Sequence, residues 1–150
     1  MPKEKDVQFL PLIKETFSQV FEDYAFDLQN EAVWDGHGEY SVTAINGDIA
    51  LIFYLSVLPQ VYYCSLGIRV SGDLAKKATS NGKPRSIDVM VIANALDLDY
   101  KHPPMQIQTN EDLKRILEKE KECLLKYCQD ILSGDVSNWS KVVSDLDKNK

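Results

Sequence analysis

The sequence predicts an α+β fold, with an N-terminal helix, a four-stranded antiparallel meander sheet and C-terminal helices packed on one face of the sheet. Residues 10–24 and 110–132 both carry apolar side chains at the three- and four-residue spacing of an amphipathic helix. Between them, Asn46-Gly47 separates two apolar runs, a pattern typical of a tight β-hairpin. The chain of 150 residues is long enough for one buried core, so we expect a single domain over residues 1–150.

Four strands are expected between the two helical patterns, and short turns between them favour a meander. The third strand is apolar on both faces, which predicts a central place in the sheet. The fourth alternates two sets of side chains, as a strand with two different faces does. The strands are predicted at residues 26–34, 39–45, 49–55 and 62–70, joined by turns at 35–38, 46–47 and 58–60.

Two segments after the meander have a different character. Residues 71–85 are rich in turn-forming residues and carry four basic side chains against one acidic one, so we expect a mobile basic loop. Residues 86–98 fit a strand by propensity and a helix by the spacing of their apolar residues, and both interpretations stay open. His102 precedes two prolines and is expected in an extended linker.

The C-terminal part predicts two helices in succession. Asn110 is the expected N-cap of the long helix, and Gly134 is expected to end it. A short helix that carries Trp139 follows. Residues 1–8 and 147–150 are expected to fray.

Charge is distributed unevenly along the chain. The formal net charge is -6, and no lysine or arginine lies between Lys14 and Arg69, a stretch of 54 residues with eight acids. Such a surface repels nucleic acid and attracts basic partners. Strands hold few charged residues, however, so four consecutive strands give a purely structural reason for the missing cations.

Several of these acids fall on or beside the first strands, near a tryptophan and a turn histidine. They suggest a binding surface for a basic protein partner, formed by Asp27, Glu31, Trp34, Asp35, His37, Glu39 and Asp48. Three tyrosines on neighbouring strands are candidates for lining a ligand pocket, and packing in the core is the alternative role for them: Tyr40, Tyr54 and Tyr63.

The sequence contains no recognisable catalytic or metal-binding constellation. It has two histidines and three cysteines, without the spacing of a zinc site, and no glycine-rich phosphate loop. We therefore predict no catalytic residue, no metal and no cofactor, and an enzyme without a recognisable motif is the least favoured interpretation. The odd number of cysteines predicts reduced, mostly buried thiols.

The ends and the hydropathy of the chain bear on its location. The first residues are charged and lack the apolar run of a signal peptide. The longest apolar run, Ile49 to Leu55, is too short to cross a bilayer. We therefore expect a cytoplasmic protein with neither a membrane nor a nucleic-acid partner.

A resemblance to known proteins adds to these expectations. Leu125 to Trp139 contains the end of a long helix, a Gly-Asp break and a tryptophan-bearing helix. This segment resembles the closing part of small uncharacterised bacterial proteins, and Tyr24-Ala25-Phe26 is similar to their entry into the sheet. Some proteins of this size, acidity and layout resemble immunity proteins, which neutralise toxins. The resemblance implies a binding role and assigns no functional residue.

The leading hypothesis is thus a non-enzymatic binding protein whose acidic surface meets a basic protein partner, with a homodimer as the other possible assembly. The alternative is a small-molecule or peptide binder that uses an aromatic pocket on the sheet. The sequence leaves open whether the second face of the sheet is covered, and an uncovered face would call for a partner or a second subunit.

Overall fold

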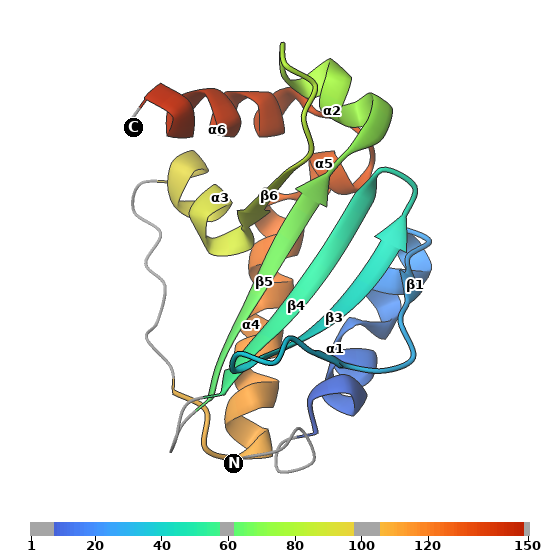
Figure 1. The fold of residues 1–150 in the computed structure, drawn as a ribbon, viewed down its shortest axis with the longest axis vertical. Coiled ribbons are helices and arrows are strands. Elements are labelled where there is room, and N and C mark those ends of the chain that lie inside the picture. The colour runs from blue at the N-terminus through green and yellow to red at the C-terminus, as the bar shows by residue number, and fades with distance from the viewer. Residues whose placement is uncertain (1–7, 58–61, 98–105, 149–150) are drawn as a thin grey trace.

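The computed structural model describes residues 8–57, 62–97 and 106–148, and it has the predicted α+β architecture (Figure 1). Helices α1 and α4 lie behind the sheet in this view, and the three long strands lie in front of them. In chain order the elements are α1 (Phe9–Asp23), β1 (Asp27–Leu28), β2 (Val33–Trp34), β3 (Glu39–Asn46), β4 (Ile49–Val57), β5 (Tyr62–Val70), α2 (Gly72–Ala78), β6 (Arg85–Asp88), α3 (Val89–Leu96), α4 (Asn110–Tyr127), α5 (Gln129–Leu132) and α6 (Ser137–Lys148).

Some expectations concern residues outside the described ranges. They are the fraying of residues 1–7 and 149–150, the turn at 58–60 and the linker at His102. At the C-terminal end, α6 continues to Lys148 and so includes the first two residues of the segment expected to fray.

The sheet is antiparallel throughout, and β4 lies at its centre as predicted. The strand order is β1-β3-β4-β5-β6, and β2 also pairs with β3. The predicted hairpin joins β3 to β4, but its two central residues are Gly47 and Asp48, because Asn46 pairs with Ile49 as the last residue of β3. Gly47 supplies the positive φ, +56°, that this turn requires. The Asn46 side chain instead donates a hydrogen bond to the carbonyl oxygen of Tyr24 at 2.7 Å.

The predicted first strand, 26–34, is interrupted in the structure. Its two ends, β1 and β2, pair with separate parts of β3. Beyond β1, the N–H of Thr43 donates to Gln29 Oε1 at 3.3 Å, so a side chain takes the place of a backbone acceptor. The Gln29 N–H still donates to Thr43 O at 2.9 Å, so Gln29 forms the last contact with β3 before the interruption.

The ambiguous segment 86–98 contains both predicted structures in succession. β6 extends the sheet to six strands and ends at Asp88, where α3 begins. The Asp88 carboxylate accepts the N–H of Met90 at 2.8 Å and so caps α3. The basic segment 71–85 also differs from the prediction, because α2 occupies Gly72–Ala78 within it.

The long C-terminal helix is capped one residue earlier than predicted and is broken near its end. Thr109 forms a capping box with Asp112, whereas Asn110 Oδ1 accepts the N–H of Gln8 at 2.7 Å and so ties α4 to the start of α1. The helix stops at Cys128, and α5 continues after it. Gly134, with φ +90°, ends α5 as predicted.

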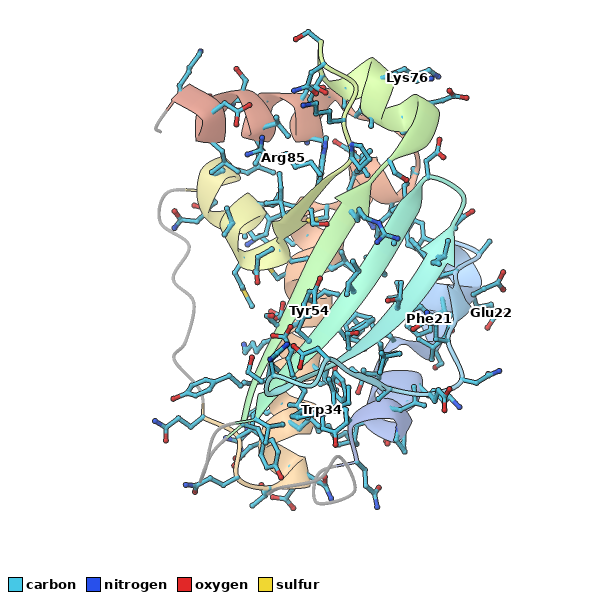
Figure 2. All side chains as sticks on the ribbon, viewed as in Figure 1. Phe21, Glu22, Trp34, Tyr54, Lys76 and Arg85 are labelled. Carbon is cyan, nitrogen blue, oxygen red and sulfur yellow. The ribbon has the colours of Figure 1, made fainter. Side chains whose placement is uncertain are left out.

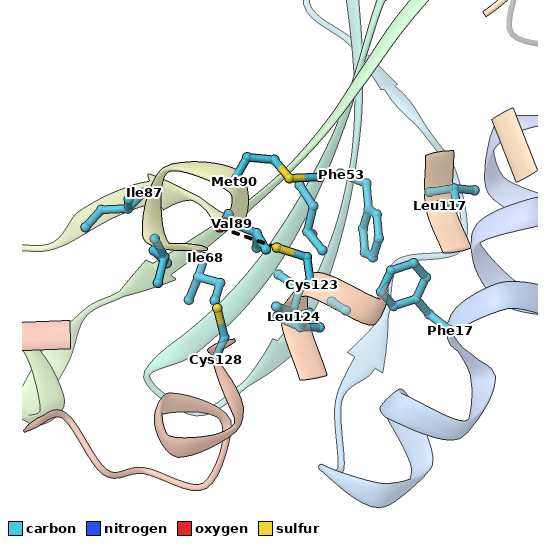
Figure 3. Packing of buried hydrophobic residues seen from close by; sticks show 14 of the residues in the cluster. Phe17, Phe53, Ile68, Ile87, Val89, Met90, Leu117, Cys123, Leu124 and Cys128 are labelled. Carbon is cyan, nitrogen blue, oxygen red and sulfur yellow. Dashed lines mark hydrogen bonds between the residues drawn. The ribbon is translucent and has the colours of Figure 1, made fainter. Parts of the chain in front are cut away.

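The core lies between the sheet and the helices behind it (Figure 3). Phe17 of α1 meets Phe53 of β4 edge to face, with ring centroids 4.8 Å apart. The buried stripe of α4 includes Leu113, Leu117 and Leu124, each with no exposed surface. The three cysteines are free and buried, as predicted. Figure 3 also shows the thiol of Cys123 close to the carbonyl oxygen of Val89, 3.9 Å away.

One acid lies inside this core. Glu120 of α4 has no exposed surface, and neither of its carboxyl oxygens is hydrogen-bonded within the described residues. Burial raises its pKa to about 9, and the negative charge of Asp88 adds to this effect. Glu120 is therefore protonated and neutral in the folded protein at pH 7.

Replacing Glu120 is expected to stabilise the protein at neutral and higher pH. Unfolding returns the carboxyl to a pKa near 4.5, so the wild type loses stability as pH rises from there to about 9. The slope is about 1.4 kcal/mol per pH unit, or about 3 kcal/mol by pH 7. Glu120→Gln removes that slope. Urea unfolding of both proteins between pH 4 and pH 9 should show unfolding free energies that diverge as pH rises.

Glu122→Gln is the matched control, because Glu122 lies on the same helix with 72% of its side chain exposed. Its profile should run parallel to that of the wild type. Parallel profiles for Glu120→Gln as well would contradict the burial of a neutral Glu120.

Candidate functional site

The face of the sheet turned away from α1 and α4 is not covered by these helices (Figures 1 and 2). We call it the open face. Directly paired residues in antiparallel strands share a face, so the register defines its members. They are Asp27, Val33, Glu39, Ser41, Thr43, Ile45, Ala50, Ile52, Tyr54, Ser56, Tyr63, Ser65, Gly67, Arg69, Ser86 and Asp88.

The open face is partly apolar. Three of its residues rank among the large hydrophobic side chains most exposed in the described chain: Val33 at 51%, Ile45 at 41% and Tyr63 at 39%. They are interspersed with serines and threonines. Ala50 and Ile52 at its centre are buried, so the face is intermediate in composition between a fully solvated face and a core.

Tyr54 lies at the middle of the open face. Its ring lies 3.7 Å from the position that a Cβ atom at residue 67 would occupy. Gly67 therefore leaves space for the ring. Burial and the nearby Glu39 carboxylate raise the pKa of the Tyr54 hydroxyl, while Arg69 opposes them. The hydroxyl therefore lies between an acid and a base on the same face. Sequence reasoning did not select Arg69, although it ends the cation-free stretch.

One group of predicted acids gathers where β3 begins. Asp35 Oδ1 accepts the N–H groups of His37 at 2.6 Å and Glu39 at 3.1 Å, and these hydrogen bonds hold the turn at 35–38. The first of them is the main reason that the pKa of Asp35 is lowered. Glu39 Oε2 accepts the hydroxyl of Ser56 at 3.1 Å across the strand pair.

Asp48 lies at the other end of β3, away from this group. Residues 39 and 46 bound the strand, so the two ends are roughly 24 Å apart at about 3.4 Å per residue. Its carboxylate is also occupied, because Oδ2 accepts the N–H of Leu74 at 3.3 Å at the start of α2. The expected set of seven residues therefore does not form one continuous rim, and Asp48 is part of the fold.

Two other acids are free to meet a partner. Asp27 is exposed beside Ile45, and Glu31 is exposed in the bend between β1 and β2. Within the described chain, neither carboxylate forms a hydrogen bond or an ion pair. The prediction that they share one face of a continuous strand is wrong, because the strand is interrupted between them.

The aromatic residues are divided between the two faces of the sheet. Tyr54 and Tyr63 lie on the open face, whereas Tyr40 pairs with the buried Leu55 on the core side. Trp34 is half-buried against Tyr40, with ring centroids 4.7 Å apart. The three tyrosines thus do not line one pocket, and Trp34 closes the end of the core.

The basic segment 71–85 does not neutralise the acids at the start of β3. Lys76 and Trp34 lie near opposite ends of the molecule in Figure 2. The described ion pairs of this segment are Lys76–Asp73 at 3.9 Å and Arg85–Asp147 at 2.7 Å. Asp35, Glu39 and Glu31 therefore keep their charge available to an incoming molecule.

The described residues contain no group of three histidine, cysteine or acidic side chains that could hold a metal ion. None of the described helices is long and apolar enough to cross a membrane. No protein-family model, curated protein or solved structure matches the chain. The resemblance of residues 125–139 to small bacterial proteins, and that of the size, acidity and layout to immunity proteins, therefore stay predictions.

The acids are expected to separate into structural and free ones when each is replaced by alanine. Asp48→Ala removes the acceptor for Leu74 N–H and should cost about 1 kcal/mol of unfolding free energy. Asp27→Ala should stay within about 0.5 kcal/mol of the wild type. Chemical denaturation at pH 7 measures both, and an equal loss in the two variants would contradict the division.

Proposed function

We propose that this chain is a non-enzymatic binding protein that docks a basic protein partner on the open face of its sheet. Its apolar residues would supply the contact, and the free acids beside them would attract and orient the partner. The single observation that supports this role most is the exposure of Val33, Ile45 and Tyr63 on one face, next to uncompensated acids.

The size of the open face sets a requirement for this proposal. Its long strands have eight or nine residues, or about 27 Å at ~3.4 Å per residue. The three long strands, about 4.8 Å apart, give a width of roughly 14 Å, and the short strands β1, β2 and β6 widen the face over part of its length. The long strands alone thus present roughly 390 Å², about half of the ~800 Å² that each partner buries in an interface of standard size, so the short strands would have to contribute as well.

The charge of the partner follows from the sequence around the face. The β1, β2 and β3 segments belong to the stretch without lysine or arginine. Within the described chain, two of their acids, Asp27 and Glu31, are free, and Asp35 and Glu39 accept uncharged donors only. Complementary charge increases the association rate and selects against acidic competitors. Neutralising a toxin with a basic surface is the most specific form of this function, and it is the form that the resemblance implies.

A homodimer through the same face is the second candidate, because Val33, Ile45 and Tyr63 are apolar. Against it, two copies would place their acids near one another, and like charges at close range destabilise an interface. An aromatic pocket for a small ligand has less support, because Tyr40 lies on the opposite face of the sheet.

Reversing charge beside the open face is expected to abolish capture of the partner. The double variant Asp27→Lys/Glu31→Lys should lose a protein that the immobilised wild type retains from a native lysate at low salt. Retention by the wild type should also fall as salt is raised, because the free acids are exposed and therefore screened. Retention is measured by quantitative mass spectrometry of the eluates.

The control is Glu22→Lys/Glu118→Lys, which changes the net charge equally on the exposed sides of α1 and α4. This variant should retain the same protein as the wild type. Equal retention by both double variants, or retention that ignores salt, would overturn the proposed surface. Size-exclusion chromatography of the wild type and Tyr63→Ser tests the homodimer, since only a dimer through this face would dissociate in the variant.

A further inference from the structure

A pocket lies at the end of the molecule opposite the acids of β3. It is enclosed by the turn between α2 and β6 and by α6, near Arg85 in Figure 2. Its volume is about 270 Å³, and it is lined by Thr79, Asn81, Lys83, Pro84, Arg85 and Val143. The lining therefore offers two cations, a hydroxyl and an amide, and no carboxylate.

The positive charge of this pocket contrasts with the rest of the chain. Residues 71–85 carry four basic side chains and one acid within a protein of net charge -6. The aliphatic part of the Lys76 side chain lies against the turn. Its Cγ is 3.1 Å from the position that a Cβ atom at residue 82 would occupy. The ammonium of Lys76 is paired with Asp73 at 3.9 Å, so Lys76 supports the turn and does not add a cation to the pocket lining.

The turn holds its lining residues in place and leaves the donors of Asn81 and Lys83 available. Thr79 Oγ1 accepts the N–H of Gly82 at 3.2 Å, and Asn81 Oδ1 accepts the N–H of Lys83 at 2.9 Å. Within the described chain, neither the Asn81 amide nitrogen nor the Lys83 ammonium donates a hydrogen bond. The backbone is therefore fixed by side-chain acceptors. The Thr79 hydroxyl is within donor distance of Ala75 O at 3.3 Å and Asn81 Oδ1 at 3.1 Å, so the donors that remain for a ligand are those of Asn81 and Lys83.

Arg85 already binds an anionic oxygen. Its Nη1 donates to Asp147 Oδ1 at 2.7 Å, and the Arg85 side chain is 29% exposed. A guanidinium has five N–H donors, so this one contact leaves others for a second anion. The Asp147 carboxylate is also a competitor, since it partly neutralises the cation that a ligand would use.

We propose that this pocket binds a small phosphate-bearing anion, held by Lys83 and Arg85. A phosphate monoester carries a charge of about −1.5 to −2 near pH 7, which matches two cations, whereas a monocarboxylate matches only one. The cavity has the volume of about nine water molecules at ~30 Å³ each, enough for a phosphate with a short organic group. This site is independent of the open face and of its partner.

Isothermal titration calorimetry of the full chain tests the proposal with inorganic phosphate, glycerol 3-phosphate and acetate at equal ionic strength. Phosphate and the phosphate ester should bind and acetate should not. Lys83→Ala should weaken binding about tenfold, as the loss of one charge-assisted contact does. Lys77→Ala is the matched control, because Lys77 is exposed on α2 and does not line the pocket. It should change the affinity less than about twofold.

The variant Asp147→Asn tests whether Arg85 binds a ligand or only forms a structural ion pair with Asp147. If Asp147 competes for Arg85, this variant should bind phosphate several-fold more tightly than the wild type. The proposal is overturned if phosphate does not bind, if Lys83→Ala and Lys77→Ala weaken it equally, or if Asp147→Asn weakens it. Far-UV circular dichroism of each variant shows that the fold is retained.

Discussion

The contact between helix α4 and the buried face of the sheet determines where the other elements can lie. Leu113, Leu117 and Leu124 have no exposed surface along α4, and burying each such side chain contributes about 1.5 to 3 kcal/mol. Helix α1 packs beside α4 and sends Phe17 against Phe53 of the central strand. Helix α3 joins the same layer through Val89 and Met90. With α1, α3 and α4 gathered on one side, no helix of the described residues packs on the other side of the sheet.

The edges of the sheet differ from this face. An unpaired strand edge can pair with another chain, and proteins avoid this with short or interrupted edge strands. Here one side of β3 is paired by the two short strands β1 and β2, and β6 covers only the last four residues of β5. The open face, in contrast, presents long strands with Tyr63 and Ile45 exposed.

Much of the fold could be predicted from local patterns, and the differences have local physical causes. The position of β4 followed from its apolar faces, and the hairpin followed from Gly47. The helix cap moved from Asn110 to Thr109 because the Asn110 side chain bonds Gln8, which is distant in sequence and close only in the folded chain. The segment 86–98 combined two signals because Asp88 ends one element and caps the next.

The candidate site was less predictable, because it depends on which residues the register brings together. Asp35 and Asp48 look alike as turn acids, yet about seven strand residues separate their ends of β3. Tyr40 and Tyr54 look alike as strand aromatics, yet they lie on opposite faces. Glu120 did leave a signal. It falls three residues after Leu117 and four before Leu124, on the buried stripe of α4, where an acid has no solvated position.

The acids at the start of β3 and the basic pocket lie at opposite ends of the sheet, whereas Asp27 pairs with Ile45 and lies toward the pocket end. Arg85 pairs with Val70, which pairs with Ile49 beside the hairpin, so the basic pocket lies at the Asn46 end of the sheet. Glu39 lies roughly 24 Å away at the other end of β3. The Debye length is about 8 Å at physiological ionic strength, so charge at one end is largely screened at the other. A phosphate in the basic pocket would therefore leave the acids at the start of β3 free to attract a basic partner.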